Sequence, residues 1–404
     1  MQLTWITRSF LDYRIPVFAE LDRLVDGGLS VLYYGEVVPE RVTEKLRAVL
    51  GDRAVALAGE WRLTGKKRMG AGFANAGIRI PFQPGLIRAA RRSEPEVIVS
   101  DGFFQWTYAA LWLRATRRIP HVMCYERTAH TERNSQWYRV AYRKRVMRWI
   151  DAMCCNGRLC GEYAQSLGFP TARITYGHMV ADVEGMIRAV AGVSADQVAA
   201  LKARLNLRGL VFLYVGRLND RKGIDKLLSA WKVCSGQIQA GGATLLLVGD
   251  GPQRGELERY TRDHGLANVR FAGAVDYDAL APFYKAADAF VIPTLEDNWS
   301  LVVPEAMACG LPILCSKYNG CWPEYVTPAN GWVFDPLSLD DTVNCLRRCC
   351  AAREKLPEMG NESRRIISGH TAKEAAAAVH EACLLAVRRR SEEHTSELQS
   401  PNTI

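Results

Sequence analysis

The sequence predicts an α/β protein with two Rossmann-like domains, each built on a doubly wound parallel sheet. Three observations support this fold class. The length of 404 residues fits two domains of ordinary size. The composition, with 48% hydrophobic and 24% charged residues, is that of a globular protein rather than a disordered or fibrous one. Apolar runs of strand length alternate with helical patterns through both halves of the chain.

The expected elements follow each other as strand, helix, strand. In the first half, strands are predicted at 3–6, 29–34, 97–100 and 121–125, with helices at 17–25 and 106–117. In the second half, strands are predicted at 210–215, 244–248, 269–272, 289–293 and 312–315, with helices from Ile224, at 279–287 and at 304–309. Strands separated by helices favour parallel pairing.

Residues 186–207 are Ala-rich and charged and lack strand signals, so we interpret them as a linker. The N-terminal domain would then span 1–185 and the C-terminal domain 208–370. A helix is predicted at 371–389, and it could pack back on the first domain. Residues 390–404 begin RSEEHTSELQS, which looks like a translated sequencing-library adapter. We therefore interpret them as read-through and leave them out of the fold, with a polar, disordered tail as the alternative.

The composition and the sequence also indicate the cellular location and the metal content to expect. No apolar run approaches the roughly 18 residues that span a bilayer, and residues 1–18 lack the apolar core of a signal peptide. The 12 cysteines are scattered, so we expect reduced thiols and a cytoplasmic location. No Cys/His cluster has zinc-site spacing, and Asp276-Tyr277-Asp278 reads better as a helix cap than as a metal motif. We expect no metal.

Charge is distributed unevenly. Residues 1–180 hold 27 Lys and Arg against 16 Asp and Glu, whereas residues 181–404 hold 25 against 27. The two halves are therefore expected to meet different partners. The basic half shows no known nucleic-acid motif, so nucleic acid is not the expected partner.

The loop after the predicted strand at 210–215 carries two cations. Gly216 permits close backbone approach, while Arg217 and Lys222 offer a planar fork and a point charge suited to phosphate. A solvated basic loop that caps a helix is the alternative. After the next strand comes a glycine turn, Gly249–Pro252, which is not G-x-G-x-x-G and could simply be a tight turn before a helix.

A third segment, 293–312, combines a loop and a helix start. Asp297 and Glu305 could accept hydrogen bonds from vicinal hydroxyls of a sugar or a ribose. The backbone N–H groups of 300–303 could face a phosphate at the start of the helix. A helix acid that interacts with the helix dipole would explain Glu305 alone, but not the whole segment.

Together these residues resemble the second domain of the retaining glycosyltransferases of family 4, the group 1 glycosyl transferases, from about 211 to 336. The resemblance implies the GT-B fold, with two Rossmann-like domains facing across a cleft. It implies a nucleotide-diphosphate sugar as co-substrate, no further cofactor, and Asp297, Glu305, Arg217 and Lys222 as candidate catalytic residues. The implied donor-binding set is Gly216, Arg217, Lys222, Gly249, Asp250, Gly251, Pro252, Phe271, Gly273, Asp297, Ser300, Leu301, Val302, Val303 and Glu305.

Within this set the resemblance implies that the two cations hold the diphosphate, Glu305 takes the ribose hydroxyls and Asp297 faces the transferred sugar. The family usually has glutamate at the first acidic position, and here Glu296 is one place out of register. The shorter Asp297 still accepts hydrogen bonds but reaches less far, so the donor sugar is left open.

The first domain resembles the family more weakly, since its opening loop lacks the usual glycine pair. Arg14 could supply charge instead, or be a surface arginine. The remaining acceptor-side candidates follow predicted strands, and a structural role is the alternative for each: Asp101, Glu126, Arg127 and His130.

Residues 137–150 mix aromatic and basic side chains. On a helix, Tyr138, Tyr142, Val146 and Trp149 share one face, with Arg139 and Arg143 beside it, and this face could lie on an anionic membrane surface. Packing of the same aromatics on the domain core is the alternative.

The resemblance predicts a retaining, metal-independent transfer of a sugar to a saccharide or lipid-linked saccharide acceptor, in bacterial surface-polysaccharide synthesis at the inner face of the membrane. The change to Asp297 and the altered first loop motivate a second hypothesis, a catalytically silent nucleotide-sugar-binding subunit. A nucleotide-sugar epimerase of the same fold is a third.

Overall fold

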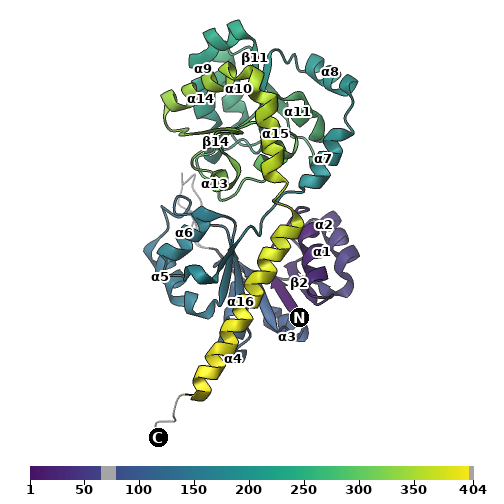
Figure 1. The fold of residues 1–404 in the computed structure, drawn as a ribbon, viewed down its shortest axis with the longest axis vertical. Helices are drawn as coiled ribbons and strands as arrows, with labels where there is room; N and C mark the ends of the chain where they lie inside the picture. Colours follow the sequence, from purple (N-terminus) through teal and green to yellow (C-terminus); the bar gives the residue numbers. More distant parts are fainter. Residues whose placement is uncertain (65–78, 400–404) are drawn as a thin grey trace. The chain divides into compact units, whose positions relative to one another are not determined.

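The computed structural model describes residues 1–64 and 79–399. The chain divides into two compact units (Figure 1). Unit 1 comprises Met1–Val180 and the segment from Ala372, and unit 2 comprises Ala181–Thr371. Each unit contains one parallel sheet covered by helices, which confirms the predicted pair of Rossmann-like α/β domains.

Unit 1 is built on a seven-stranded sheet in the order β3-β2-β1-β6-β7-β8-β9, with every pairing parallel. Strands β1 and β2 are buried along their whole length, as expected for a sheet covered on both faces. The strands are β1 (Leu3–Ile6), β2 (Leu29–Tyr34), β3 (Ala54–Leu57), β6 (Val97–Asp101), β7 (His121–Tyr125), β8 (Ala152–Cys155) and β9 (Ile174–Tyr176). The last two and β3 were not predicted. A separate antiparallel pair joins β4 (Trp61–Thr64) and β5 (Arg79–Phe82).

The first helices of unit 1 follow the strands in chain order. They are α1 (Arg14–Leu24), α2 (Glu40–Leu50), α3 (Leu86–Arg92), α4 (Thr107–Arg117), α5 (Trp137–Val146) and α6 (Arg158–Ser166). The last helix of the chain, α16 (Ala372–Gln399), also belongs to this unit and packs against α1 and the sheet (Figure 1). The buried side of α16 consists mainly of small residues, such as Ala376 and Ala382, around Val379. These small side chains let the helix approach the sheet closely.

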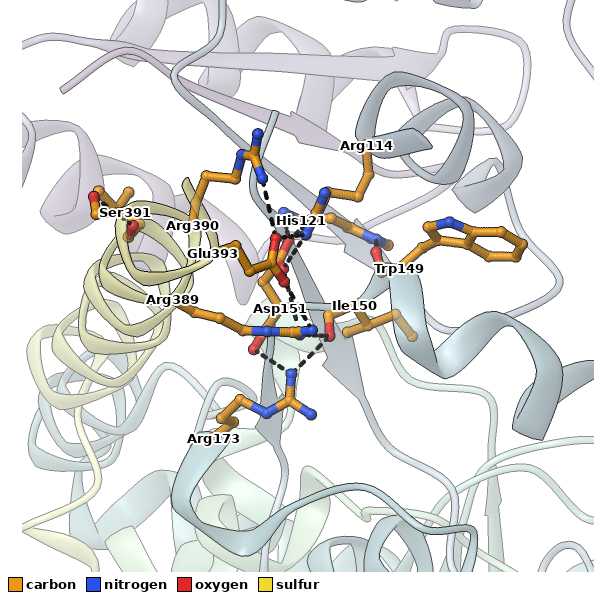
Figure 2. A network of polar contacts seen from close by, with 11 residues as sticks. Arg114, His121, Trp149, Ile150, Asp151, Arg173, Arg389, Arg390, Ser391 and Glu393 are labelled. Carbon is orange, nitrogen blue, oxygen red and sulfur yellow. Dashed lines mark hydrogen bonds and ion pairs between the residues drawn. The ribbon is translucent and has the colours of Figure 1, made fainter. Parts of the chain in front are cut away.

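The end of α16 is tied to unit 1 by ion pairs around Asp151, directly before β8 (Figure 2). Fully buried, Asp151 accepts two hydrogen bonds from Arg114, at 2.7 and 3.0 Å. Arg114 also donates to Glu393, at 2.7 Å. The exclusion of 390–404 from the fold is therefore corrected for 390–399, which continue α16, contain no Gly or Pro to interrupt it and carry Glu393 to Arg114. Their origin as adapter read-through stays a prediction.

Unit 2 contains a six-stranded sheet in the order β12-β11-β10-β13-β14-β15, again with parallel pairings. The strands are β10 (Leu210–Val215), β11 (Ala243–Val248), β12 (Val269–Gly273), β13 (Ala289–Ile292), β14 (Ile313–Ser316) and β15 (Gly331–Phe334). The helices are α7 (Val183–Ala191), α8 (Ala195–Arg204), α9 (Ile224–Gly241), α10 (Arg254–Asp263), α11 (Ala281–Ala286), α12 (Val302–Ala308), α13 (Trp322–Tyr325), α14 (Leu339–Ala351) and α15 (Leu356–Ile367).

Residues 186–207, expected to form a linker, are mostly helical in α7 and α8. Helix α7 starts at Asp182, whose side chain caps the N–H of Gly185, and α8 starts with a capping box at Ser194. Both helices pack on α11. The linker prediction is corrected, because the Ala-rich composition marks helices here and the second unit already begins at Ala181.

Within residues 1–64 and 79–399, no helix is long and apolar enough to cross a membrane.

Candidate functional site

The strand order of unit 2 reverses between β10 and β13. In open parallel sheets, ligands bind beyond the carboxyl ends of the strands at such a switch point. The three predicted loops meet at this edge. Leu218 N–H donates to Asp250 O at 2.9 Å, which joins the loops after β10 and β11. Leu295 N–H donates to Arg221 O at 2.7 Å, which joins the loops after β10 and β13.

Glycines make this close approach possible. Gly249 has φ +137°, and a Cβ there would lie 1.9 Å from Gly216 O. A Cβ on Gly251 would lie 2.1 Å from Leu218 O. Larger residues at either position would push the two loops apart. The turn is therefore needed to pack protein loops together at the switch point.

Lys222 and Asp297, from the loops after β10 and β13, form an ion pair across the switch point. Asp297 also accepts hydrogen bonds from Ser300 Oγ at 2.6 Å and from Trp299 N–H at 3.3 Å. Burial alone would raise the pKa of Asp297, but the attraction and hydrogen bond of Lys222, with the Ser300 bond, hold it below its ordinary value. The carboxylate predicted to face the sugar is therefore bound to the cation predicted to hold the diphosphate.

Glu305 lies in the first turn of α12 and is 6% exposed. Its Oε2 accepts a hydrogen bond from the hydroxyl of buried Tyr284, at 2.8 Å. Burial raises the pKa of Glu305 to about 7, against the Tyr284 hydrogen bond and with a small addition from Asp182. Thus the two predicted carboxylates of the site have pKa values shifted in opposite directions.

The remaining donor-side candidates lie around this pair. Arg217 is exposed, and among the residues that the structure describes it has no ion-pair partner. Asp250 Oδ1 accepts from Gly251 N–H, and its Oδ2 accepts from Arg254, a residue that the sequence analysis missed, at 3.0 Å. Gly249 N–H donates to Gly273 O at 2.7 Å, which brings the end of β12 and the half-buried Phe271 to the same edge as the turn that contains the exposed Pro252.

The start of α12 differs in detail from the expectation. The helix begins at Val302, after Ser300 and Leu301. Val303 N–H already donates to Ser300 O at 3.2 Å, so this N–H is used within the turn. Ser300 is engaged with Asp297 through its hydroxyl. In this structure the segment supports Asp297 through the hydroxyl of Ser300.

Unit 1 has its own switch point, between β1 and β6. Arg14, after β1, lies 3.8 Å from Asp101 at the end of β6, measured between Nη2 and Oδ1. Trp5 Nε1 donates to the same oxygen at 3.3 Å, and the guanidinium lies over the Trp5 ring. Arg14 is 5% exposed, so it is not a surface arginine.

The other acceptor-side candidates all lie on the loop after β7. Arg127 lies 3.6 Å from Glu132, which is bound to buried Arg143, so its side chain belongs to an internal ion cluster. Glu126 and His130 are half-buried on the same loop after β7. The structure brings Arg14 and Asp101 together, and it pairs Arg127, whose side chain stays 31% exposed, with Glu132.

Two buried residues near the sites were missed by the sequence analysis. His178 follows β9, and its Nε2 donates to Tyr125 O at 3.1 Å. Burial, with the charge of Arg14, lowers the pKa of His178 to about 3, so it is neutral. Identifying the strand at 174–176 would have placed it at the carboxyl edge. Tyr284 gave no signal, because a tyrosine in a helix pattern reads as core.

The predicted membrane face of 137–150 is corrected. Arg139 and Arg143 are buried, their guanidinium groups lie over the ring of Phe104, and Arg143 pairs with Glu132. The face that remains exposed is a different stripe of α5 and the following turn, which we call the α5 surface: Trp137, Tyr138, Lys144, Arg145 and Arg148. Trp137 is 80% exposed.

Asp276 occupies the N-cap position of the 3₁₀ turn Tyr277–Ala279, but its side chain makes no capping hydrogen bond. The predicted cap is corrected in this detail, since the turn is closed by the backbone bond from Ala279 N–H to Asp276 O. In the part of the chain that the structure describes, no group of three or more His, Cys, Asp or Glu could hold a metal ion.

Residues 200–366 match the family model described as glycosyl transferases group 1, and residues 39–184 match the model described as glycosyltransferase family 4. The two matched segments coincide with the second sheet and with much of the first. The chain belongs to the GT-B glycosyltransferases of this group, which confirms the resemblance.

Relatives agree with this assignment. The chain is 31% identical over 155 residues to the sulfoquinovosyl transferase SQD2 of Arabidopsis thaliana, covering 38% of this chain and 29% of the relative. It is 26% identical over 308 residues to a glycogen synthase of Mycobacterium tuberculosis, covering 71% and 70%. The match to the first thus spans less than a third of its length. In fold, the chain resembles Anabaena HepE in complex with UDP, with a TM-score of 0.71, 17% identity and coverage of 94% and 99%.

The buried carboxyl of Glu305 gives a testable pH dependence of stability. Its pKa rises from 4.5 to about 7 on folding, so its contribution to stability falls as the pH rises from 4.5 to 7. Glu305→Gln cannot ionise, and we expect it to be more stable than the natural protein at pH 8 by about 1–3 kcal/mol. Urea unfolding of both proteins at pH 5 and pH 8 measures this. An equal difference at both pH values would contradict it.

Proposed function

We propose that this protein is a retaining glycosyltransferase that uses a nucleotide-diphosphate sugar as donor, without a metal or other cofactor. The observation that carries the proposal is the ion pair of Lys222 and Asp297 at the switch point of unit 2, with the half-open carboxyl of Glu305 in the first turn of the helix that follows the same loop. A cation for phosphate and a carboxylate for a diol lie on neighbouring loops, at the place where an open parallel sheet binds its ligand.

The exposed Arg217 and the paired Lys222 supply the charge that a diphosphate needs. Lys222 is already fixed by Asp297, so it is oriented before the donor arrives. In the reaction both cations stabilise the charge that develops on the leaving diphosphate. Two such cations take the role that a divalent metal has in other nucleotide-dependent enzymes.

Asp297 is a poor nucleophile in this arrangement, because Lys222, Ser300 and the N–H of Trp299 all donate to it. We therefore propose displacement on the same face of the sugar, without a covalent enzyme intermediate. The acceptor hydroxyl adds to the anomeric carbon as the bond to the diphosphate breaks, and the departing phosphate oxygen takes the acceptor proton.

For the acceptor, we propose a saccharide or lipid-linked saccharide bound at the carboxyl edge of unit 1, near Arg14 and Asp101. The α5 surface supports a peripheral position on the inner face of the cytoplasmic membrane, because its exposed tryptophan and three cations suit an anionic interface. A role in bacterial surface-polysaccharide synthesis fits such an acceptor.

The proposal is tested by nucleotide release from UDP-, GDP-, ADP-, dTDP- and CMP-sugars, with and without a bacterial lipid extract. We expect release from one donor that rises with lipid. Arg217→Ala should lose about 2–3 kcal/mol of donor binding, the scale of charge-assisted hydrogen bonds, measured by calorimetry. It is a cleaner variant than Lys222→Ala, which would also leave the half-buried Asp297 without its ion-pair partner.

Nucleotide binding without release would instead favour a silent binding subunit, and isomerised donor without acceptor would favour an epimerase. Unchanged donor affinity in Arg217→Ala would refute the phosphate assignment of that residue.

The membrane position is tested by co-sedimentation with vesicles that contain anionic lipid. Replacement of Lys144, Arg145 and Arg148 by Glu should weaken partitioning by more than tenfold, since each basic side chain near an anionic surface contributes about 1 kcal/mol. Arg143 stays unchanged because it pairs with buried Glu132.

As the charge control, Arg204→Glu with Lys232→Glu reverses exposed cations on unit 2. Equal partitioning of all three proteins would remove the α5 surface as the contact.

A further inference from the structure

We propose that Tyr284 is a positioning residue of the donor site, whose hydroxyl holds one oxygen of Glu305 so that the other oxygen is presented to the two ribose hydroxyls of the nucleotide. This inference rests on the proposed function, in which Glu305 takes the ribose. It assigns a role to a residue that the sequence pattern marks only as core.

The contact itself is short and enclosed. Tyr284 lies on α11, is fully buried, and its hydroxyl is 2.8 Å from Glu305 Oε2. In the part of the chain that the structure describes, Glu305 Oε1 has no hydrogen-bond partner. One oxygen is therefore fixed by the protein, and the other is left for a ligand.

Toward the ionised carboxylate of Glu305 the phenol can act only as a donor, because the carboxylate only accepts. Burial, together with the neighbouring carboxylate of Glu305, raises the pKa of Tyr284 well above its ordinary value, so the hydroxyl keeps its proton. A donated hydrogen bond stabilises the ionised form of Glu305, which is the form that can accept hydrogen bonds from both hydroxyls of a diol.

Among the described residues, the other charged and titratable groups around Glu305 do not pair with it. Asp182, at the start of α7, adds negative charge, and Cys309, directly after α12, is a buried thiol with a raised pKa. Arg364, on α15, which also packs on α12, donates to Cys309 O at 2.9 Å rather than to Glu305. Helix α7 packs on α12, and α11 packs on α7. Tyr284 is thus the group among these neighbours that stabilises the Glu305 carboxylate, and its loss is not compensated by a nearby charge.

Fixed orientation is the second effect. A carboxylate at the first turn of a short helix can rotate about its side-chain bonds, and each rotamer aims its free oxygen elsewhere. The hydrogen bond to Tyr284 selects one rotamer before the nucleotide binds, so less freedom is lost on binding.

The test measures binding of UDP, GDP and ADP by calorimetry between pH 6 and pH 9. For Tyr284→Phe we expect about tenfold weaker binding at pH 7, the scale of one hydrogen bond to a charged group. Because the carboxylate of Glu305 loses its donor, its pKa should rise, and the pH midpoint of nucleotide binding should move upward by about one unit. The loss of affinity relative to the natural protein should therefore be smaller at pH 9 than at pH 7.

Tyr260→Phe is the matched control. It removes a phenol hydroxyl in the same unit, from α10, where the hydroxyl lies 3.5 Å from Ser229 Oγ. We expect its nucleotide binding to equal that of the natural protein. Glu305→Asp, which reaches one methylene less toward Tyr284, should repeat the upward shift of the midpoint and provides a second variant if Tyr284→Phe folds poorly.

The outcomes separate the two claims. If Glu305→Gln binds nucleotide as well as the natural protein, or if the natural protein binds none, the proposed donor site is overturned together with this inference. If Glu305→Gln loses affinity but Tyr284→Phe keeps both its affinity and its pH midpoint, only the role of Tyr284 is overturned. A uniform loss at every pH in Tyr284→Phe, without a shift of the midpoint, would likewise reduce Tyr284 to a structural role.

Discussion

The ion pair between Lys222 and Asp297 is the interaction on which the candidate donor edge depends. The two residues come from the loops after β10 and β13, which flank the reversal of strand order in unit 2. Without the pair, the half-buried carboxylate of Asp297 would lose its cation, and the backbone hydrogen bond from Leu295 to Arg221 would remain as a link between the two loops. Gly249 and Gly251 let the loop after β11 approach the loop after β10 as well. The site therefore depends on the packing of backbone loops as well as on its side chains.

The pKa values of the two acids at this edge, Asp297 and Glu305, are shifted in opposite directions, and the difference has a physical cause. Asp297 has a cation, a hydroxyl and a backbone N–H, so its pKa is lowered despite burial. In the described part of the chain, the carboxyl of Glu305 has one hydrogen-bond donor, the neutral hydroxyl of Tyr284, so burial prevails and its pKa is raised to about 7. Carboxylates with pKa values moved apart are suited to different tasks at one pH. In the proposed reaction Asp297 fixes a cation, and Glu305 binds neutral hydroxyls.

The sheets were predictable from the sequence because buried parallel strands are continuous apolar runs, as in β10 and β11. Lys222, Asp297 and Glu305 could be named as candidates from the sequence, since each follows a strand that could be identified, and their roles at the site stay predictions. Side-chain direction was not predictable. The basic residues of α5 divide between Arg143, turned into the core, and Arg145, turned to solvent, and only the packing of Phe104 and Glu132 decides which.

Other differences have similar causes. Residues 186–207 lack strand signals, and of the two caps that define the helices, Asp182 lies before this stretch and Ser194 lies inside it. In the sequence pattern Tyr284 has the place of a core residue. Its hydroxyl can be assigned a role only when its partner, Glu305, 21 residues away, is known. Arg14 and Asp101 show the same principle in unit 1, where an arginine and an aspartate meet across the switch point from distant segments.

The most direct test of the donor edge is hydrogen exchange of the full chain with and without a nucleoside diphosphate at a concentration that calorimetry shows to saturate. We expect slower exchange in the loops at 216–223, 249–252 and 297–305, and little change in the loops of unit 1. Saturated binding with protection confined to unit 1, or with no protection in these three loops, would contradict a donor site at the switch point of unit 2.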